Sequence, residues 1–490
     1  MLDLLKKESN ITHTENGGTA YRSSESYCLD MFFKAGAMRN SSAEEIADTV
    51  IRAYTEDPDK TMKIIFFARD ARGGLGERRF FRCAVSALVN TAPEAVEKNI
   101  PLFAEYGRYD DLCILIGTPL ENAAVKVIKT QLEKDMAAMR ENKPASLLAK
   151  WLPSVNTSSK ATRNSGRRIA SLLGMSERTY RKTLSALRKY TDTIENRLRE
   201  RDYTFRYEIQ PSCAMFKYRN AFIRNDGERY TDYLNKVHSG EAKMNADRLF
   251  PYDIVRAAMS DKISPAENLS LDAAWKSLPD LTASKSENAL AVIDGSGSMT
   301  FSCGGIRPID AALSLGIYFA EHNKGRFANQ FITFSEHPRL VEIKGNNIVE
   351  KVKFCRTYNE MANTNLEAVF NLILRTAVKN NVPAADMPSK LYIISDMQFD
   401  YCIIGGNDEP MFREMRKLYE KNGYKLPEII FWNVNARCDA IPVNRSETGS
   451  ALVSGYTPAV FDMVMSGDCS PEAVMDNILC SERYAAITAA

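Results

Sequence analysis

The stretch that decides the fold is residues 288–300, NALAVIDGSGSMT. Four apolar residues run directly into Asp294, and Ser296 and Ser298 follow at a spacing of two. A short apolar run that ends in a turn signal is typical of a buried strand. The glycines between the polar residues allow the sharp turn that must follow such a strand. The pattern therefore predicts a carboxylate and two hydroxyls at the exit of a buried strand.

From about residue 286 the sequence alternates strand-like and helix-like segments. Strand patterns lie at 288–294, 330–335, 339–345, 390–397 and 428–435, with a shorter segment near 451–461, and helix patterns lie at 305–323, 365–381, 408–423 and 470–487. Such alternation is typical of a mostly parallel sheet with helices on both faces. We therefore predict a doubly wound α/β domain over 286–490, with its binding site beyond the carboxyl ends of the strands.

Before residue 285 helix-period patterns follow one another, and no segment is a convincing strand. They lie at 41–57, 58–71, 76–90, 92–107 and 121–142. The first opens with the capping-box spacing of Ser42 and Glu45. Helix after short helix predicts an α helical-repeat domain over 1–285, HEAT-like and stacked as a solenoid or a curved ring, although no repeat of fixed length is visible.

Length and composition agree with a folded protein of two or more domains. The chain has 490 residues, 44% hydrophobic and 26% charged, which exceeds the size of a single core and excludes a disordered composition. Its ten cysteines form no C-x-x-C pair and have no histidine at zinc-ligand spacing, so we expect reduced thiols. We find no apolar run of 18 residues and no signal-peptide pattern, and we expect a cytoplasmic protein without a membrane partner.

The net charge of +2 conceals a strong asymmetry. Residues 1–285 hold 45 basic and 38 acidic residues, whereas 286–490 hold 19 basic and 24 acidic ones. The excess is concentrated at 160–219, with 15 basic and 6 acidic residues. A basic region of this kind indicates an anionic partner such as nucleic acid.

Within that region the segment 175–190, MSERTYRKTLSALRKY, separates into two faces when it is drawn as a helix. Tyr180, Leu184 and Leu187 form an apolar stripe, and Ser176 is a suitable N-cap. Basic residues on the opposite side and in the preceding segment TRNSGRR could follow a phosphate backbone, and we predict an RNA-binding set of Arg163, Arg167, Arg168, Arg178, Arg181, Lys182, Arg188 and Lys189. The alternative is a solvated basic face without a ligand.

The residues at the exit of the first strand also suggest a metal site. One carboxylate with two hydroxyls is an all-oxygen set that suits Mg²⁺ or another divalent cation such as Mn²⁺. Further donors are expected from neighbouring strand ends, and the sequence offers Thr364 in ANTNLEAVF and Asp396 in YIISDMQFD. The predicted ligands are Asp294, Ser296, Ser298, Thr364 and Asp396; the alternative is a turn capped by its own side chains.

This set of motifs resembles the metal-ion-dependent adhesion site of von Willebrand factor A domains. The resemblance implies that Ser296 and Ser298 bind the ion directly and that Asp396 acts mainly through water. It also implies that Asp294 and Thr364 bind directly or through water, and that a carboxylate from a partner completes the coordination. Many members carry glycine before the threonine, whereas Ala362 and Asn363 precede Thr364 here.

A helical region joined to such a domain resembles the Ro autoantigen, which combines a TROVE-type ring of helical repeats with a von Willebrand factor A domain and binds noncoding RNA. More of the chain is similar to an uncharacterised two-domain family related to Ro, through FFARDARGGLGERRFFR (66–82), GRYDDL (107–112), KWLPS (150–154), SERTYRKTLSALRK (176–189) and FPYDIV (250–255). The resemblance implies a ribonucleoprotein whose A domain docks a metal-dependent partner.

Two other functions stay open at this point. One is a metal-dependent adaptor that binds protein partners without RNA. The other is a metal-dependent nuclease or phosphatase, which we consider last because no histidine or glutamate lies beside the motifs as a base, and we therefore predict no catalytic residue and no enzyme.

The glycine-rich segment 69–79 lacks the G-x-x-x-x-G-K-[ST] pattern of a phosphate loop. We expect a tight connector between two helices there, with Arg69, Arg72, Arg78 and Arg79 as salt-bridge partners or secondary RNA contacts.

Overall fold

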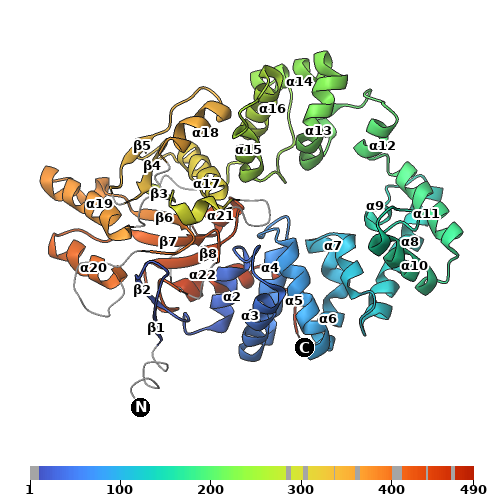
Figure 1. Ribbon diagram of the computed structural model, residues 1–490, viewed down its shortest axis with the longest axis horizontal. Coiled ribbons are helices and arrows are strands. Elements are labelled where there is room, and N and C mark those ends of the chain that lie inside the picture. Colours follow the sequence, from blue (N-terminus) through green and yellow to red (C-terminus); the bar gives the residue numbers. More distant parts are fainter. Residues whose placement is uncertain are drawn as a thin grey trace. The chain divides into compact units, whose positions relative to one another are not determined.

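The computed structural model describes residues 10–282, 288–301, 307–335, 337–358, 365–399, 411–436, 440–464 and 470–489 (Figure 1). The chain forms two compact units, and each is assembled from two separate stretches of sequence. The sheet unit comprises residues 1–42 and 211–481, and the helical unit comprises residues 43–210 and 482–490.

The predicted first strand of the α/β domain forms β3 (Ala289–Asp294), and all six of its residues are buried. It lies inside a six-stranded sheet of order β5-β4-β3-β6-β7-β8. The other strands are β4 (Gln330–Phe334), β5 (Leu340–Glu342), β6 (Lys390–Ser395), β7 (Glu428–Asn433) and β8 (Ser450–Ser454). All neighbours are parallel except the edge strand β5, which runs antiparallel to β4. This confirms the predicted mostly parallel sheet.

The strand order explains where a binding site can form. The chain proceeds from β3 through β4 to β5 on one side, and then from β6 through β7 to β8 on the other. The direction of winding therefore reverses between β3 and β6, which pair in parallel with Ile293 opposite Ile394. Such a reversal leaves a crevice beyond the carboxyl ends of the two strands. Asp294, the last residue of β3, lies at this switch point.

The sheet unit contains eleven α-helices in its described residues, and the buried helix α17 is packed against β3. The set comprises α2 (Tyr27–Ala35), α13 (Ser212–Asn225), α14 (Gly227–Ser239), α15 (Pro251–Ala258), α16 (Pro265–Lys276), α17 (Pro308–His322), α18 (Ile348–Arg356), α19 (Leu366–Asn380), α20 (Met411–Lys421), α21 (Ala459–Val464) and α22 (Pro471–Leu479). Two short 3₁₀ helices, η4 (Gly297–Thr300) and η5 (Ala384–Asp386), complete it.

The prediction that no strand lies before residue 285 is wrong. Two short strands, β1 (Ile11–His13) and β2 (Thr19–Tyr21), form an antiparallel hairpin there. Strands of three residues are too short to produce a recognisable alternation of polar and apolar residues. The stretch that follows, α2, packs against β8, where the backbone N–H of Gly36 donates to Ser454 Oγ over 3.0 Å. Helices α15 and α16 likewise pack on α17 and α18. The two compact units are thus divided at positions other than residue 285. The predicted domains over 1–285 and 286–490 stay a prediction.

The helical unit consists of successive helices joined by short connectors. They are α3 (Ala43–Glu56), α4 (Pro58–Arg69), α5 (Arg78–Thr91), α6 (Pro93–Asn99), η1 (Ile100–Leu102), α7 (Phe103–Tyr106), η2 (Tyr109–Leu115), α8 (Glu121–Arg140), α9 (Leu148–Trp151), α10 (Lys160–Leu172), α11 (Glu177–Tyr190), α12 (Ile194–Arg199) and η3 (Tyr207–Ile209). Phe66, Phe81 and Phe103 meet edge to face in its core. The predicted connector at 70–77 links α4 to α5, as expected.

The last residues of the chain complete this helical core. Arg483 pairs with Asp70, and the hydroxyl of Tyr484 lies 3.2 Å from the same carboxylate. The Tyr484 ring stacks on Tyr106 at 5.9 Å between centroids, and Ile487 is fully buried. The short helix η6 (Glu482–Tyr484) therefore belongs to the helical unit although it follows the sheet in sequence.

A prediction follows from the contact between α17 and β3. A Cβ added at Gly316 would lie 2.1 Å from Ile293 Cδ1, so Gly316→Ala should lower the free energy of unfolding by about 1–3 kcal/mol through overpacking. Adding Ile293→Val, which removes that methyl group, should recover part of the loss. Gly227→Ala is the control, because a Cβ there meets open space. Chemical denaturation measures all four proteins, and equal stability of Gly316→Ala and wild type would contradict the contact.

Candidate functional site

The polar residues after β3 gather at the carboxyl edge of the sheet. Asp294 is fully buried; its Oδ1 accepts a hydrogen bond from the Ser296 N–H at 2.9 Å, and its Oδ2 accepts one from Ser395 Oγ at 2.5 Å. The hydroxyls of Ser296 and Ser298 lie 3.0 Å apart. Asp396 follows the neighbouring strand β6 and is also buried. Two acids and two serine hydroxyls therefore lie at adjacent strand ends; we call them the strand-end site.

The fifth predicted ligand, Thr364, lies outside the described residues. The structure resumes at Asn365, whose side chain accepts a hydrogen bond from the Ala368 N–H at 2.8 Å and caps α19. The structure thus brings four of the five predicted metal ligands to one edge of the sheet, and the role of Thr364 stays a prediction.

The strand-end site carries negative charge in a buried place. Burial, and after it the charge of Asp396, raises the pKa of Asp294 to about 7. Ser335 follows the other neighbouring strand, β4, and its buried Oγ has no hydrogen-bond partner among the described residues. Among those residues no group of three or more His, Cys, Asp or Glu side chains could hold a metal. The donors that do meet here, two carboxylates and several hydroxyls, fit a hard divalent cation, which would offset the repulsion between the acids.

Three contributors to this site were missed at the level of sequence. Ser395 fixes Asp294, Ser335 adds a buried hydroxyl, and Gln398 connects the loop after β6 to the N-terminal hairpin. The Gln398 side chain accepts a hydrogen bond from the Glu15 N–H at 2.9 Å. Ser335 ends a predicted strand and Ser395 lies near the end of another, which is a usable signal. The hairpin contact joins residues far apart in sequence and left none.

The pKa of Asp294 predicts how metal-free protein responds to pH. The pKa of Asp294 is higher in the folded protein than its unfolded value of 3.8. The contribution of this carboxyl to the free energy of unfolding is therefore complete below about pH 4 and is lost as pH rises through about 7. At about 1.4 kcal/mol per pKa unit the loss is about 4 kcal/mol. In chelator, the free energy of unfolding of wild type should fall by this amount relative to Asp294→Asn between those pH values. Parallel pH curves for the two proteins would contradict the buried charge.

The predicted basic helix forms α11, and its N-cap and apolar stripe are confirmed. Ser176 Oγ accepts a hydrogen bond from the Thr179 N–H at 3.1 Å, and Tyr180, Leu184 and Leu187 are buried. Arg178, Arg181, Lys182 and Lys189 are exposed, and none of their side chains has a hydrogen bond or ion pair to another described residue. At 3.6 residues per turn these four lie within an arc of about 100° opposite the buried stripe. We call them the α11 cationic face.

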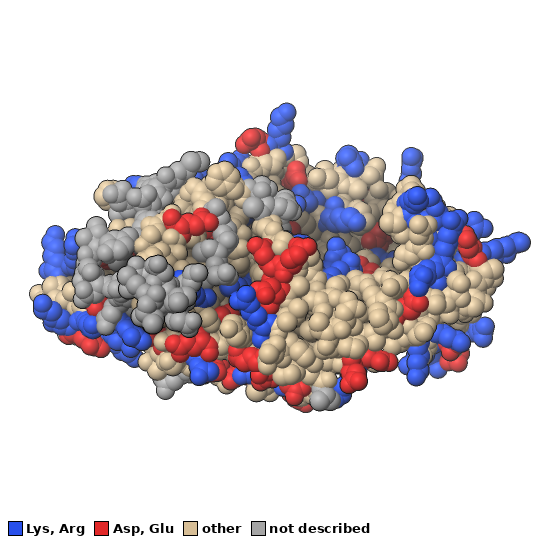
Figure 2. All heavy atoms as spheres, turned by 60° about the horizontal axis from the view of Figure 1, so that its bottom comes forward, with Lys and Arg blue, Asp and Glu red and all other residues tan. Residues whose placement is uncertain are grey.

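The other four predicted RNA contacts have partners within the helical unit. Arg188 is half-buried and donates to Ala149 O at 2.7 Å, Ser154 Oγ at 2.7 Å and Leu152 O at 2.8 Å. Arg163 donates to a backbone carbonyl, that of Thr157. Arg167 pairs with Glu177 and Arg168 with Glu121, both on the surface. Figure 2 shows Lys and Arg side chains gathered at the right-hand end, where Figure 1 places α10 and α11.

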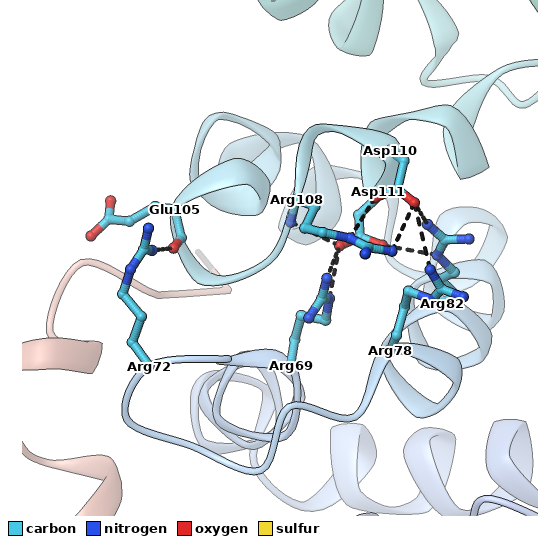
Figure 3. A network of polar contacts seen from close by, with 8 residues as sticks. All are labelled: Arg69, Arg72, Arg78, Arg82, Glu105, Arg108, Asp110 and Asp111. Atoms are coloured by element: carbon cyan, nitrogen blue, oxygen red, sulfur yellow. Dashed lines mark hydrogen bonds and ion pairs between the residues drawn. The ribbon is translucent and has the colours of Figure 1, made fainter. Parts of the chain in front are cut away.

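The arginines of the glycine-rich segment and of its flanking helices form a polar network with the acids of GRYDDL. Arg69 and Asp111 are a buried ion pair of 2.7 Å, and Arg82 and Arg108 bind the adjacent acids Asp110 and Asp111 (Figure 3). Arg78 lies 3.7 Å from Asp110, and Arg72 donates to the carbonyl of Glu105. Arg69 and Arg78 are thus salt-bridge partners, as predicted.

Two further motifs of the sequence, KWLPS (150–154) and the basic helix segment (176–189), also lie in the helical unit. Tyr180 donates its hydroxyl to Pro153 O at 3.1 Å, and Arg188 donates to Leu152 O and Ser154 Oγ of KWLPS. The Arg108 guanidinium lies 4.0 Å from the Trp151 ring centroid. GRYDDL, KWLPS and the basic helix are therefore three parts of one packed region.

The elements described so far define a two-unit protein: a doubly wound α/β domain with polar residues at its switch point, and a unit of short helices. The chain belongs to the family described as domain of unknown function DUF2828, whose model matches residues 14–124 and 158–294. A second model, domain of unknown function DUF7788, matches residues 288–483.

Two individual proteins are similar over nearly the whole chain. The uncharacterized protein L728 of Acanthamoeba polyphaga mimivirus is 28% identical over 498 residues, which span 94% of this chain and 85% of the relative. The crystal structure of the Ro (RSR) protein of Deinococcus radiodurans aligns with 93% of this chain and 99% of its own, at 12% identity and a TM-score of 0.37. The architecture given above is read from the strand order and helices of this chain itself. In the described part of the chain, no helix combines the length and apolar character needed to cross a membrane.

Proposed function

We propose that this protein binds RNA through the α11 cationic face of its helical unit. The observation that carries the proposal is that Arg178, Arg181, Lys182 and Lys189 share one face of α11 and that their side chains have no partner in the part of the chain that the structure describes. Unpaired cations in one arc can each contact a backbone phosphate and release a counterion. The proposal agrees with the expectation from the sequence motifs related to Ro.

The spacing of these residues favours an extended anion over a small one. From Arg178 to Lys189 the helix rises by about 16 Å, so the face is longer than a single phosphate group. The contacts involve charge alone and would not read base identity. Four such contacts predict a salt slope of about 3 for single-stranded RNA.

The test is the double reversal Arg181→Glu with Lys182→Glu, in titrations with a single-stranded RNA at two salt concentrations. Affinity should fall at least about tenfold, and the salt slope should decrease by about 1.4, because two phosphate contacts are lost. Thermal stability should stay within about 0.5 kcal/mol, since both side chains are exposed.

The matched control is Lys126→Glu with Lys129→Glu, an equal change of charge on exposed positions of α8. This control should leave the affinity for RNA within about twofold of wild type, because it weakens only the nonspecific electrostatic attraction between protein and RNA. Equal losses in the two double mutants, or no binding by wild type, would exclude the α11 cationic face as an RNA site. The protein would then be best explained as an adaptor that binds protein partners.

We further propose that the strand-end site binds Mg²⁺ or a similar divalent cation, which a partner's carboxylate completes. The buried pair of acids and the unsatisfied hydroxyl of Ser335 support this, because a cation would neutralise the first and coordinate or order water for the second. Ser296 and Ser298 would supply neutral oxygens, so the ion would keep enough positive charge to attract an acidic group. The proposed role is binding, and Mg²⁺-dependent cleavage of the RNA during titration would instead indicate a nuclease.

Mg²⁺ should therefore raise the melting temperature of the protein. A hundredfold excess over Kd adds about 2.7 kcal/mol of stability when only the folded state binds. Asp294→Ala should abolish the response, whereas Asp462→Ala, at an exposed acid of the same unit, should preserve it. A response of equal size in Asp294→Ala would place the ion elsewhere.

A further inference from the structure

Three arginines of the helical unit converge on a partly exposed acid that cannot neutralise them. Arg78 begins α5, Arg82 lies one turn further along it, and Arg108 precedes η2; all three lie around Asp110 (Figure 3). Their side chains are 51%, 31% and 31% exposed, and that of Asp110 is 20% exposed. An ion in solution can therefore reach Arg78 and the exposed parts of Arg82 and Arg108.

The same carboxylate oxygen forms the ion pairs with all three arginines. Asp110 Oδ2 lies 3.0 Å from Arg82 Nη2, 3.1 Å from Arg108 Nη2 and 3.7 Å from Arg78 Nη1. Including the buried Arg69–Asp111 pair, the network holds four arginines and two aspartates. The cluster thus carries two positive charges in excess.

Two of the arginines have donors that the protein does not satisfy. Arg78 is beyond hydrogen-bond distance from Asp110 and makes no hydrogen bond to any described residue. Arg82 Nη2 is buried and, despite its distance of 3.0 Å from Asp110, is not aligned for a hydrogen bond. Burial, and after it the charges of Arg108 and Arg82, lowers the pKa of Arg78. The cluster therefore contains repulsion that an added anion would relieve.

We infer that Arg78, Arg82 and Arg108 bind a phosphate-type oxyanion, either free phosphate or a phosphate group of a nucleic acid. Guanidinium groups match the oxygens of such an ion with paired, charge-assisted hydrogen bonds. Helix α5 begins at Arg78, so the positive end of its dipole adds to the attraction. This site is separate from the α11 cationic face, shares no residue with it and does not depend on the proposed RNA function.

Arg78 is the residue to test, because Arg82 also binds the buried Asp111 and the Arg108 guanidinium also lies over the Trp151 ring, so the loss of either side chain would remove a contact inside the unit. The full chain is titrated with inorganic phosphate by calorimetry and melted in phosphate or chloride of equal ionic strength. Phosphate should bind wild type and raise its melting temperature. In Arg78→Gln the affinity should fall at least about tenfold, as expected for the loss of a charge-assisted contact. Without phosphate, wild type and Arg78→Gln should melt alike.

The control is Arg140→Gln, which removes an exposed arginine at the end of α8 and should keep the full phosphate response. No phosphate binding by wild type, an equal response in Arg78→Gln, or an equal loss in Arg140→Gln would each overturn the inference.

The RNA titration of Arg78→Gln then identifies the source of the phosphate. Unchanged RNA affinity with a lost phosphate response indicates a site for the free ion, and a parallel loss of RNA affinity indicates a phosphate of the bound RNA. Either result supports the site. Because Arg181→Glu with Lys182→Glu leaves this cluster intact, its phosphate response should survive even if the α11 cationic face proves irrelevant to RNA.

Discussion

The buried carboxylate of Asp111 is the contact on which the helical unit depends. It accepts hydrogen bonds from Nε of Arg69 at 2.7 Å, from Nε of Arg82 at 2.8 Å and from the backbone N–H of Arg108 at 3.1 Å, and it is fully buried. One side chain thereby joins α4, α5 and the start of η2. Removing one partner of such a pair typically costs about 3–5 kcal/mol, because the other charge stays buried. The network also requires Gly107, where a Cβ would lie 2.5 Å from Asp111 Oδ2.

Charged side chains in this protein lie in two kinds of cluster: one in which positive and negative groups are paired, and one in which like charges lie close together. Around Asp111 the donors and acceptors are matched, and the residues serve the fold. At the strand-end site the negative charge of Asp396 adds to burial in raising the pKa of Asp294, and around Asp110 three arginines share one oxygen. Like charges held together reduce stability unless a ligand compensates them. Both clusters are therefore places where binding would return stability to the protein.

Much of the sheet unit could be predicted from the sequence because its signals are local. The apolar run before Asp294 predicts a strand, and the carboxyl ends of neighbouring parallel strands must meet, which brings Asp396 to the same edge. The hairpin β1–β2 could not be predicted because its strands of three residues show no recognisable alternation. The docking of α2 on β8 could not be predicted because its partner lies hundreds of residues away. The same reason hid the role of Arg188, whose three acceptors lie 34 to 39 residues earlier in the chain.

The basic region shows why a count of charges overestimates a binding surface. Arg188 is held by two carbonyls and a hydroxyl in a partly buried place, so exchanging these for a phosphate would leave buried acceptors unsatisfied. The pairs of Arg167 with Glu177 and of Arg168 with Glu121 are exposed on the arginine side, and such surface pairs contribute about 0–1 kcal/mol. A phosphate can therefore compete for these two arginines but not for Arg188. Within this basic region, the surface that an anion could reach consists of the four α11 cations whose side chains have no partner among the described residues, with Arg167 and Arg168 as contacts that become available when their ion pairs open.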